Sequence, residues 1–530
     1  MTDRQRVVVV TGGGGGIGAA IAESAARAGA FVVTVDPLVS VDGSAQLPRP
    51  LEDTETTAGR IIAAGGAARA SALSVTDESG IRELFGQLAD EFGGLDAVVN
   101  VAGISRPTGF VKGSDEDWRG VLSVHLDGYR NILCAALPLM AAAGRGHVLG
   151  VTSGSGWRAA DSGAYGCAKR AVASLTWQLG RHAPDGVVIN AISPIAATRM
   201  VAAALGRTQR TGGSATGGLS LGAMPAPEDL GPLGAHLVSD NFKSCHGRVL
   251  FLGGSEVAVI DEPRLIEVVR SDEVPSLAHL QEVATNVALA PAEANQVSGG
   301  GSNARFGSTF DEPPAERLPV AAVRSCAIVA DRPEVMAALS CALQSWGVEC
   351  QAIDDPAALA GLDALDAVVV ALAGRPASTS AASDWERVLD EHDAIVDRIQ
   401  ADARWSRAIG DVATTNGRPI RLVTITDATT TGGRSLAQAM VQLSRSGRQA
   451  TDDLVLPFAV SAEADEVPAE LAAHLVCSPE AVGLTGAELV SGAGWFGLRS
   501  HPRPVGSISF GGPEVPRWFD YALREVVTPR

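Results

Sequence analysis

The chain has 530 residues, too many for one ordinary hydrophobic core, so we expect two or three domains. Hydrophobic residues make up 46% and charged residues 19%, and the 60 glycines with few aromatic residues favour an α/β protein over an all-β one. The formal net charge of −18 argues against binding to a nucleic-acid backbone, which needs dense Lys and Arg.

Seven cysteines are scattered along the chain without a Cys-x-x-Cys pair or a paired framework. The opening MTDRQRVVVVTGGG lacks a signal-peptide pattern, and no apolar run approaches the roughly 20 residues that span a bilayer. We therefore expect a cytoplasmic protein with inert thiols and no metal site, and a redox role for the cysteines is the alternative.

Strand-like and helix-like runs alternate through about the first 260 residues of the chain. Apolar runs at 7–10, 31–35, 96–103 and 147–153 predict strands, and an amphipathic helix is expected at 17–28. Because these runs are continuous rather than alternating, we expect parallel strands covered on both faces, as in a doubly wound Rossmann-type sheet.

The composition changes after about residue 275. The segment 276–318 is rich in Gly, Ser, Pro and charge, which predicts a flexible linker. A new strand–helix–strand unit begins at 325–354. The expected division is therefore a first domain at 1–275, this linker, and a second domain at 319–530.

The second domain repeats the first in order. LDAVVNVAG (95–103) is answered by LDAVVVALAG (365–374), DWRGVLSVH (117–125) by DWERVLDEH (384–392), and the segment 234–254 by 472–494. Three matches in the same order predict a duplicated fold. The expected fold class is α/β, with two tandem Rossmann-type doubly wound parallel-sheet domains.

The glycine run TGGGGGIG (11–18) lies between the first strand and the first helix. Glycines there let the backbone approach a dinucleotide pyrophosphate, which then lies at the helix N-terminus. The next strand ends in Asp36, whose carboxylate is suited to both adenosine-ribose hydroxyls and would repel a 2′-phosphate. The pattern favours NAD over NADP, and a simple loop aspartate before Pro37 is the alternative reading of Asp36.

Tyr165 and Lys169 are spaced i, i+4, so they share one face of a helix. A phenol is a poor acid or base at neutral pH, but a nearby ammonium lowers its pKa by stabilising the phenolate. Ser153, at the end of the preceding strand, is placed to donate a hydrogen bond to a substrate oxygen. These residue types predict proton transfer at an alcohol or a carbonyl.

Together, TGGGGGIG, NVAG (100–103), Ser153, YGCAK (165–169) and NAISPIAATRM (190–200) resemble the short-chain dehydrogenase/reductase family over residues 5–262. The resemblance implies an NAD(P)-dependent oxidoreductase in which Tyr165 is the acid/base, Lys169 binds the nicotinamide ribose and Ser153 positions the carbonyl. It also implies that Asn100 lines the cofactor site and that Thr198 contacts the nicotinamide carboxamide. The implied cofactor-binding residues are Gly12, Gly16, Ile17, Gly18, Asp36, Asn100, Ala102, Gly103, Tyr165, Lys169, Pro194 and Thr198.

His125 stands where the family has its active-site asparagine. Its ring is a candidate member of a proton relay, and the alternative is that only its backbone carbonyl holds a relay water. The VHLxG form and the segment 35–46 are similar to the (3R)-hydroxyacyl-CoA dehydrogenase domain of multifunctional enzyme type 2. The segment 200–224 is expected to form a substrate loop, in which Arg207 and Arg210 are candidates for CoA phosphates or are simply solvated.

The second copy lacks the corresponding groups. AIVADRPEVMAA (327–338) has no glycine in place of the glycine loop, and Leu436 and Met440 fall at the Tyr–Lys spacing. We expect a degenerate domain without cofactor or catalytic motifs, which pairs with the first as a pseudo-dimer within one chain, alongside a possible homo-oligomer. The rival idea is that HPRP (501–504) and the C-terminal tail reach a neighbouring active site.

Two functions follow from the sequence. The first is an NAD-dependent oxidoreductase acting on a secondary alcohol or ketone of a lipid-like substrate, a 3-hydroxyacyl-CoA or a steroid-like or alicyclic alcohol. The alternative is a cofactor-binding regulatory or assembly protein that uses the duplicated fold for interaction.

Overall fold

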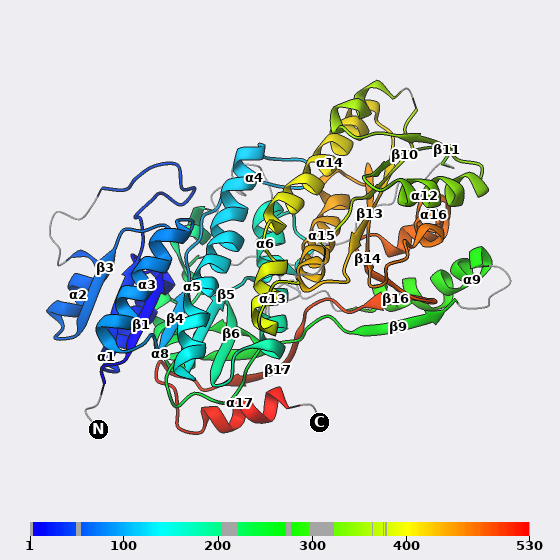
Figure 1. The fold of residues 1–530 in the computed structure, drawn as a ribbon. Helices are drawn as coiled ribbons and strands as arrows, with labels where there is room; N and C mark the ends of the chain where they lie inside the picture. Colours follow the sequence, from blue (N-terminus) through cyan, green and yellow to red (C-terminus); the bar gives the residue numbers. More distant parts are fainter. Residues whose placement is uncertain are drawn as a thin grey trace.

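The computed structural model describes residues 4–48, 55–203, 221–271, 277–296, 323–362, 364–374, 376 and 379–528. Two parallel-dominated sheets lie side by side, each covered by helices on both faces (Figure 1). No helix among the described residues combines the length and the apolar character needed to cross a membrane.

The first sheet has the strand order β17-β8-β7-β6-β5-β4-β1-β2-β3 among the described residues. Its strands are β1 (Val7–Thr11), β2 (Phe31–Val35), β3 (Ala67–Ser71), β4 (Ala97–Asn100), β5 (Gly146–Val151), β6 (Val187–Pro194), β7 (Val249–Gly253), β8 (Glu256–Ile260) and β17 (Pro504–Ser509). Its helices are α1 (Gly16–Arg27), α2 (Thr57–Ala63), α3 (Glu78–Phe92), α4 (Asp115–Leu122), α5 (Gly128–Ala143), α6 (Gly163–His182), α8 (Pro227–Leu237) and α17 (Phe519–Val527).

The valine run of β1 explains why this sheet is covered on both faces. Val7 and Val9 pack into the core beneath α3, α5 and α6, whereas Val8 and Val10 pack into the core beneath α1 and α8. All four side chains are fully buried. A continuous apolar run is what a central parallel strand requires, because successive side chains point to opposite faces.

The second sheet has the order β11-β10-β12-β13-β14-β15-β16-β9. Its strands are β9 (Leu265–Arg270), β10 (Ser325–Ala330), β11 (Glu349–Ala352), β12 (Ala367–Ala371), β13 (Ile420–Asp427), β14 (Val455–Ala462), β15 (Glu488–Gly492) and β16 (Trp495–Arg499). Its helices include α12 (Pro333–Ser345), α13 (Asp384–Glu391), α14 (Ile395–Asn416), α15 (Thr431–Ala450) and α16 (Ala469–Cys477).

One repeated contact supports the predicted duplication. Asp96 accepts a hydrogen bond from the backbone N–H of Val7 at 2.7 Å, at the start of β1. Asp366 accepts one from the N–H of Ser325 at 3.2 Å, at the start of β10. Both aspartates directly precede the strand that pairs in parallel with that first strand, β4 with β1 and β12 with β10. The fold class expected from the sequence is confirmed.

The two sheets exchange their edge strands. β8 belongs to the first sheet, but β9, which follows it, pairs antiparallel with β16 of the second sheet. In return β17, which follows β16, pairs antiparallel with β8 of the first sheet. Figure 1 shows β9 in green beneath the second sheet and β17 in red along the first. The expected boundary at 275 therefore cuts the chain after a strand that belongs to the second sheet.

The segment expected to be a flexible linker is partly ordered. Residues 277–294 form α9 (Leu277–Ala284), a π-helical turn and α10 (Ala290–Ala294). Leu277, Leu280 and Ala284 recur at helical spacing and pack against the core of the second sheet. This periodicity corrects the expectation of a linker over the first part of 276–318; residues 297–318 lie outside the described residues.

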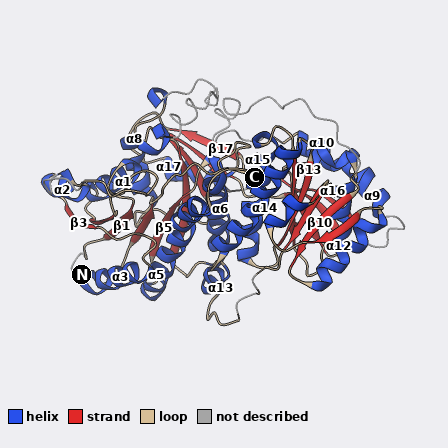
Figure 2. Cartoon of the chain, turned by 90° about the horizontal axis from the view of Figure 1, so that it is seen from above, coloured by secondary structure: helices blue, strands red, loops and turns tan. Residues whose placement is uncertain are grey.

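The two domains share one hydrophobic core. A single buried cluster runs from the first sheet through α4, α5 and α6 to α13, α14, α15 and the second sheet. Seen from above, α6, α14 and α15 lie between the two sets of strands (Figure 2). The face of the first domain that carries α4, α5 and α6 is therefore partly apolar and packs against the second domain.

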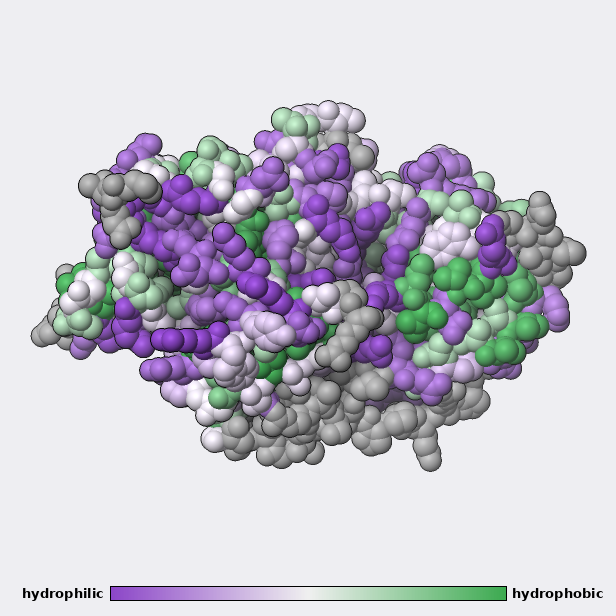
Figure 3. All heavy atoms as spheres, turned by 90° about the horizontal axis from the view of Figure 1, so that it is seen from below, coloured by the Kyte–Doolittle hydropathy of each residue, from purple (hydrophilic) through white to green (hydrophobic). Residues whose placement is uncertain are grey.

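An apolar area is exposed at the far end of the second sheet. The view from below shows it as a green area at the end where β9 and α9 lie (Figure 3). The exposed large apolar side chains there are Leu265, Ile266 and Val268 on β9, with Val283 and Val287.

Candidate active site

The glycine loop connects β1 to α1 at the carboxyl end of the first sheet. Gly12 has a φ of +65°, and a Cβ there would stand 2.8 Å from the backbone nitrogen of Ala102. A Cβ at Gly18 would stand 2.3 Å from the carbonyl oxygen of Gly12. The start of α1 has no side-chain cap and no acidic residue in its first turn. Its first N–H groups therefore have no side-chain cap and are available to an anion.

Asp36 follows the last residue of β2 and lies beside this loop. Its Oδ2 accepts a hydrogen bond from the N–H of Gly14 at 2.9 Å, and its Oδ1 accepts one from the N–H of Leu38 at 2.8 Å. The carboxylate thus holds the glycine loop in place. Each oxygen keeps further lone pairs for a hydroxyl donor.

Asn100 ends β4 and is buried next to the loop. Thr11 Oγ1 donates to Asn100 Oδ1 at 2.7 Å and accepts from the N–H of Ala102 at 3.2 Å. Gly103 follows, and a Cβ there would lie 2.4 Å from Cε1 of His125. The NVAG sequence is therefore fixed by its packing against both the glycine loop and His125.

Thr198 lies on the other side of the loop, beyond the end of β6 at Pro194. A Cβ at Gly16 would stand 3.8 Å from the methyl carbon of Thr198. Ile17 is partly buried against the core under α1. The structure therefore brings the cofactor residues predicted from the sequence together at the carboxyl ends of the strands of the first sheet.

Ser153, Tyr165 and Lys169 meet beneath these strand ends. Ser153 caps a short 3-10 turn after β5, where its Oγ accepts a hydrogen bond from the N–H of Ser155 at 3.3 Å, and its side chain lies near enough to Tyr165, the third residue of α6, to influence the pKa of the phenol. Lys169 lies one helical turn later, with Nζ 5.6 Å from the centre of the Tyr165 ring. Nζ donates to the carbonyl oxygen of Val151 at 2.6 Å.

Burial dominates the electrostatics of these groups. It raises the pKa of Tyr165, and the nearby Ser153 side chain partly opposes that rise. It lowers the pKa of Lys169 to about 7. A proton on Lys169 is therefore held weakly at neutral pH, and an added positive charge beside Tyr165 would favour the phenolate strongly in this low-dielectric setting.

His125 lies on a π-helical turn between α4 and α5, with its ring edge-on to Tyr165 at 5.2 Å between centres. Its Nε2 is 2.8 Å from the carbonyl oxygen of Ile104, which only accepts, so Nε2 carries the proton. Burial lowers the pKa of His125 to about 3. The ring is neutral, and its one N–H is bound to a group that takes up no proton. This geometry favours a fixed packing role for the ring over a proton relay.

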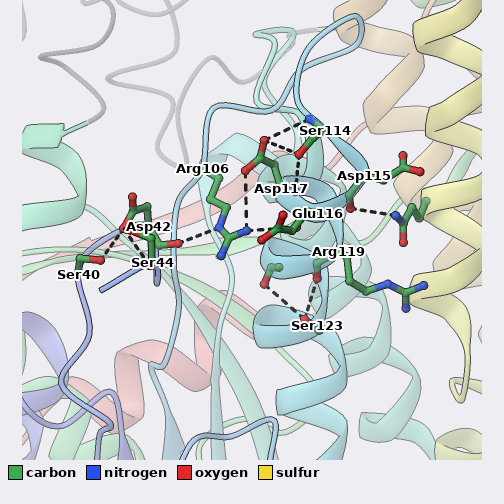
Figure 4. A network of polar contacts seen from close by, with 12 residues as sticks. Ser40, Asp42, Ser44, Arg106, Ser114, Asp115, Glu116, Asp117, Arg119 and Ser123 are labelled. Carbon is green, nitrogen blue, oxygen red and sulfur yellow. Dashed lines mark hydrogen bonds and ion pairs between the residues drawn. The ribbon is translucent and has the colours of Figure 1, made fainter. Parts of the chain in front are cut away.

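The segment after β2 is connected by hydrogen bonds through Arg106, which follows β4, to helix α4. Asp42 accepts hydrogen bonds from Ser40 and Ser44, which lower the pKa of its carboxyl to about 2. Arg106 Nε donates to the carbonyl oxygen of Asp42 at 2.8 Å, and Arg106 Nη1 donates to that of Glu116 at 3.2 Å. Figure 4 shows this link from the segment to the start of α4. The predicted substrate loop lies outside the described residues from 204 to 220, including Arg207 and Arg210.

The second sheet carries different groups at the same positions. Only Asp331 and Arg332 connect β10 to α12. Val370 pairs with Val329 in the register that Asn100 has with Thr11. The crevice at the ends of β10, β12, β13 and β14 holds a cavity of about 210 Å³. Its polar lining residues are Arg332, Asp427, Asp465 and Glu466.

Helix α15 corresponds to α6, but its register differs from the one expected. Both helices have 20 residues, and counting from their first residues places Gly433 at the position of Tyr165 and Ala437 at that of Lys169. Leu436 and Met440, predicted at these places, are instead buried in the shared core. The connection from β13 to α15 is shorter than the one from β5 to α6, which shifts the register.

Comparisons with known proteins agree with this geometry. A family model described as short chain dehydrogenase matches residues 6–208. Cis-4-hydroxycyclohexanecarboxylate dehydrogenase of Sinomonas cyclohexanicum is 35% identical over 260 residues, which are 48% of this chain and 98% of that protein. Meso-2,3-butanediol dehydrogenase of Serratia marcescens is 29% identical over 268 residues, which are 49% of this chain and 98% of that protein.

One solved structure resembles almost the whole chain. The N-domain of a bacterial malonyl-CoA reductase, solved with NADP, covers 92% of this chain and 97% of its own at a TM-score of 0.61. Its sequence identity is 15%, so the likeness concerns the fold alone. The tandem arrangement of two sheets is thus a fold known from another protein.

Proposed function

The chain belongs to the short-chain dehydrogenase family, and on that premise we propose that its first domain interconverts a secondary alcohol and a ketone with NAD, at one site centred on Tyr165. The observation that carries this proposal is the clustering of Ser153, the partly buried Tyr165 and the buried Lys169 beside a glycine loop too tight for side chains. The chain is an oxidoreductase of this family; the particular site, cofactor preference and substrate are what we propose.

The loop suits a dinucleotide because its backbone packs too closely for a Cβ at Gly12 or Gly18, and because the N-terminus of α1 has no side-chain cap and could bind a pyrophosphate. Oxidised NAD, when bound, supplies the hydride acceptor and a positive charge near the phenol. Asp36 would bind the adenosine ribose and repel a 2′-phosphate, which supports NAD over NADP. Asn100 and Thr198 would line the nicotinamide side of the pocket.

The residues of this chain then handle the proton. Ser153 would donate a hydrogen bond to the substrate oxygen and hold it near the Tyr165 hydroxyl. Tyr165 would take the alcohol proton on oxidation and return it on reduction. Lys169, one turn along α6, would favour the phenolate through its charge and bind the nicotinamide ribose.

For the substrate we propose a secondary alcohol on an alicyclic or lipid-like molecule. The names of the two relatives, a hydroxycyclohexanecarboxylate dehydrogenase and a butanediol dehydrogenase, support the class of secondary alcohol. A 3-hydroxyacyl-CoA is the lipid-like member of the proposal, on the resemblance of the first domain to multifunctional enzyme type 2. The two alternatives differ in charge and size, so a substrate panel separates them.

For the second domain we propose a scaffold role without dinucleotide binding. A two-residue connection replaces the glycine loop, and the carboxylates Asp427, Asp465 and Glu466 at its crevice would repel a pyrophosphate. The shared core and the paired helices α6 and α15 support a pseudo-dimer within one chain.

The test is a cofactor-reduction assay at 340 nm with NAD or NADP and a panel of cyclic alcohols, steroid alcohols and 3-hydroxyacyl-CoAs. We expect turnover of at least one class with NAD, and loss of turnover by at least about a thousandfold in Tyr165→Phe with NAD binding retained. Full activity of Tyr165→Phe would refute the role of Tyr165. Tight NAD binding without turnover of any class would favour a regulatory protein instead.

A further inference from the structure

Helix α6, which carries Tyr165 and Lys169, is enclosed by the second domain. It is buried almost continuously from Gly163 to Leu179. Helix α15 lies along it, and at Gly166 an added Cβ would be only 3.3 Å from Cγ of Gln442. The position of α6 is therefore set by the second domain as much as by its own sheet.

Arg170, the residue after Lys169, reaches across this contact. Its Nε donates to Gln438 Oε1 at 2.8 Å, and its Nη2 donates to Glu488 Oε2 at 2.7 Å. Gln438 donates in turn to the other oxygen of Glu488. The three side chains form a closed hydrogen-bonded group, which we call the Arg170 cluster. Arg170 and Glu488 are both 0% exposed.

The charges of this cluster depend on each other. Burial raises the pKa of Glu488, and the positive charge of Arg170 is the largest influence that opposes the rise. An ion pair fully removed from water keeps its partners in one geometry, because separating them would leave an uncompensated buried charge. The cluster therefore holds α6 and β15 in a fixed relative orientation through hydrogen bonds of defined geometry.

The same stretch of α6 backbone also touches the Ser153 turn. A Cβ at Gly156, in the turn that Ser153 caps, would be 2.9 Å from the backbone nitrogen of Arg170. Thr152 Oγ1 donates to the carbonyl oxygen of Lys169 at 2.5 Å. The backbone at 169 and 170 is thus held between the Ser153 turn on one side and the Arg170 cluster on the other.

We infer that Arg170, Gln438 and Glu488 are positioning residues, through which the second domain fixes α6 so that Tyr165 and Lys169 face Ser153 at working distance. This inference rests on the proposed function. The second domain then contributes to the reaction without touching substrate or cofactor. Loss of the cluster leaves the reacting groups present but lets the helix shift against the turn.

The test compares three variants of the full chain. Glu488→Gln removes the negative charge of the cluster, which leaves the buried guanidinium of Arg170 uncompensated, so this variant can fail to fold. The second variant therefore carries both Arg170→Met and Glu488→Met, which removes both buried charges together. Arg404→Gln is the matched control, since it removes an exposed interdomain ion pair with Asp115 at 2.6 Å. The readouts are kcat and KM across pH and hydrogen exchange of peptides from 163–182.

We expect the double variant to fold, to lose at least about tenfold in kcat with KM for the alcohol within about threefold, and to shift the pH profile of kcat. Exchange in α6 should quicken, while Arg404→Gln matches the wild type. Wild-type kcat, pH profile and exchange in the folded double variant would overturn the inference. If the wild type turns over no alcohol, the proposed function fails, and the exchange of α6 alone decides the positioning role: unchanged exchange overturns it.

Discussion

Replacing Lys169 by methionine should stabilise the protein while it removes the proposed activity. Burial lowers the pKa of this lysine from 10.5 to about 7, which costs the folded state about 5 kcal/mol wherever the group is charged in both states, below about pH 7. Loss of the Nζ hydrogen bond to Val151 takes back about 1–2 kcal/mol. The net gain is about 3 kcal/mol.

The size of the expected shift in Tm follows from chain length. With an unfolding entropy of about 2.1 cal/mol/K per residue, a gain of about 3 kcal/mol corresponds to roughly 3 °C for this chain. Between about pH 7 and pH 10.5 the unfolded chain holds more protons at Lys169 than the folded chain, so wild-type stability rises with pH. The advantage of the variant should therefore be largest at about pH 6 and shrink toward pH 10.

The assay is thermal unfolding of the cofactor-free wild type and Lys169→Met from about pH 6 to pH 10, followed by circular dichroism. Lys243→Met is the matched control, because Lys243 is exposed; this variant should not share the gain in Tm that Lys169→Met shows at pH 6. A Lys169→Met variant that is less stable than wild type at pH 6, or whose advantage grows with pH, would refute the burial argument.

Three further predictions concern the loop, the cofactor preference and the shared core. Gly18→Ala should abolish measurable NAD binding, because its Cβ would lie 2.3 Å from the Gly12 oxygen, whereas Gly86→Ala, which has open space, should bind NAD normally in calorimetry. Asp36→Ala should raise the ratio of kcat/KM for NADP to that for NAD at least about tenfold, since a charge-assisted hydrogen bond is worth about 1.5–3 kcal/mol; an unchanged ratio would contradict the role of Asp36. A chain ending at 275 should aggregate on size exclusion, because it exposes α6 and the β8 edge that β17 covers; a monodisperse, fully active fragment would contradict the shared core.

Much of the first site is predictable from sequence because its signals are local. The glycine loop, Asp36 and the i, i+4 pair of Tyr165 and Lys169 each depend on a few adjacent residues in a known place between strand and helix. The structure brings them to one edge of the sheet through the parallel order of β1, β4 and β5.

Other features depend on contacts between distant parts of the chain. The strand exchange leaves no local mark, because LIEVVR and PVGSIS are ordinary strand sequences whose partners are set by packing. Arg170 resembles a solvated helical arginine, yet its partner Glu488 lies 318 residues away. In α15 a run rich in Ala, Gly and Ser fits several registers. The positions of Gly433 and Ala437 depend on the short connection from β13, whose length the sequence pattern does not fix.

The claim that each chain has one working site, in the first domain, is tested most directly by the stoichiometry of NAD binding. Titration calorimetry of the full chain should give one NAD per 530-residue chain. The same titration on Gly18→Ala should give none. A stoichiometry of two, or one binding event that survives Gly18→Ala, would contradict the account by placing cofactor in the second domain.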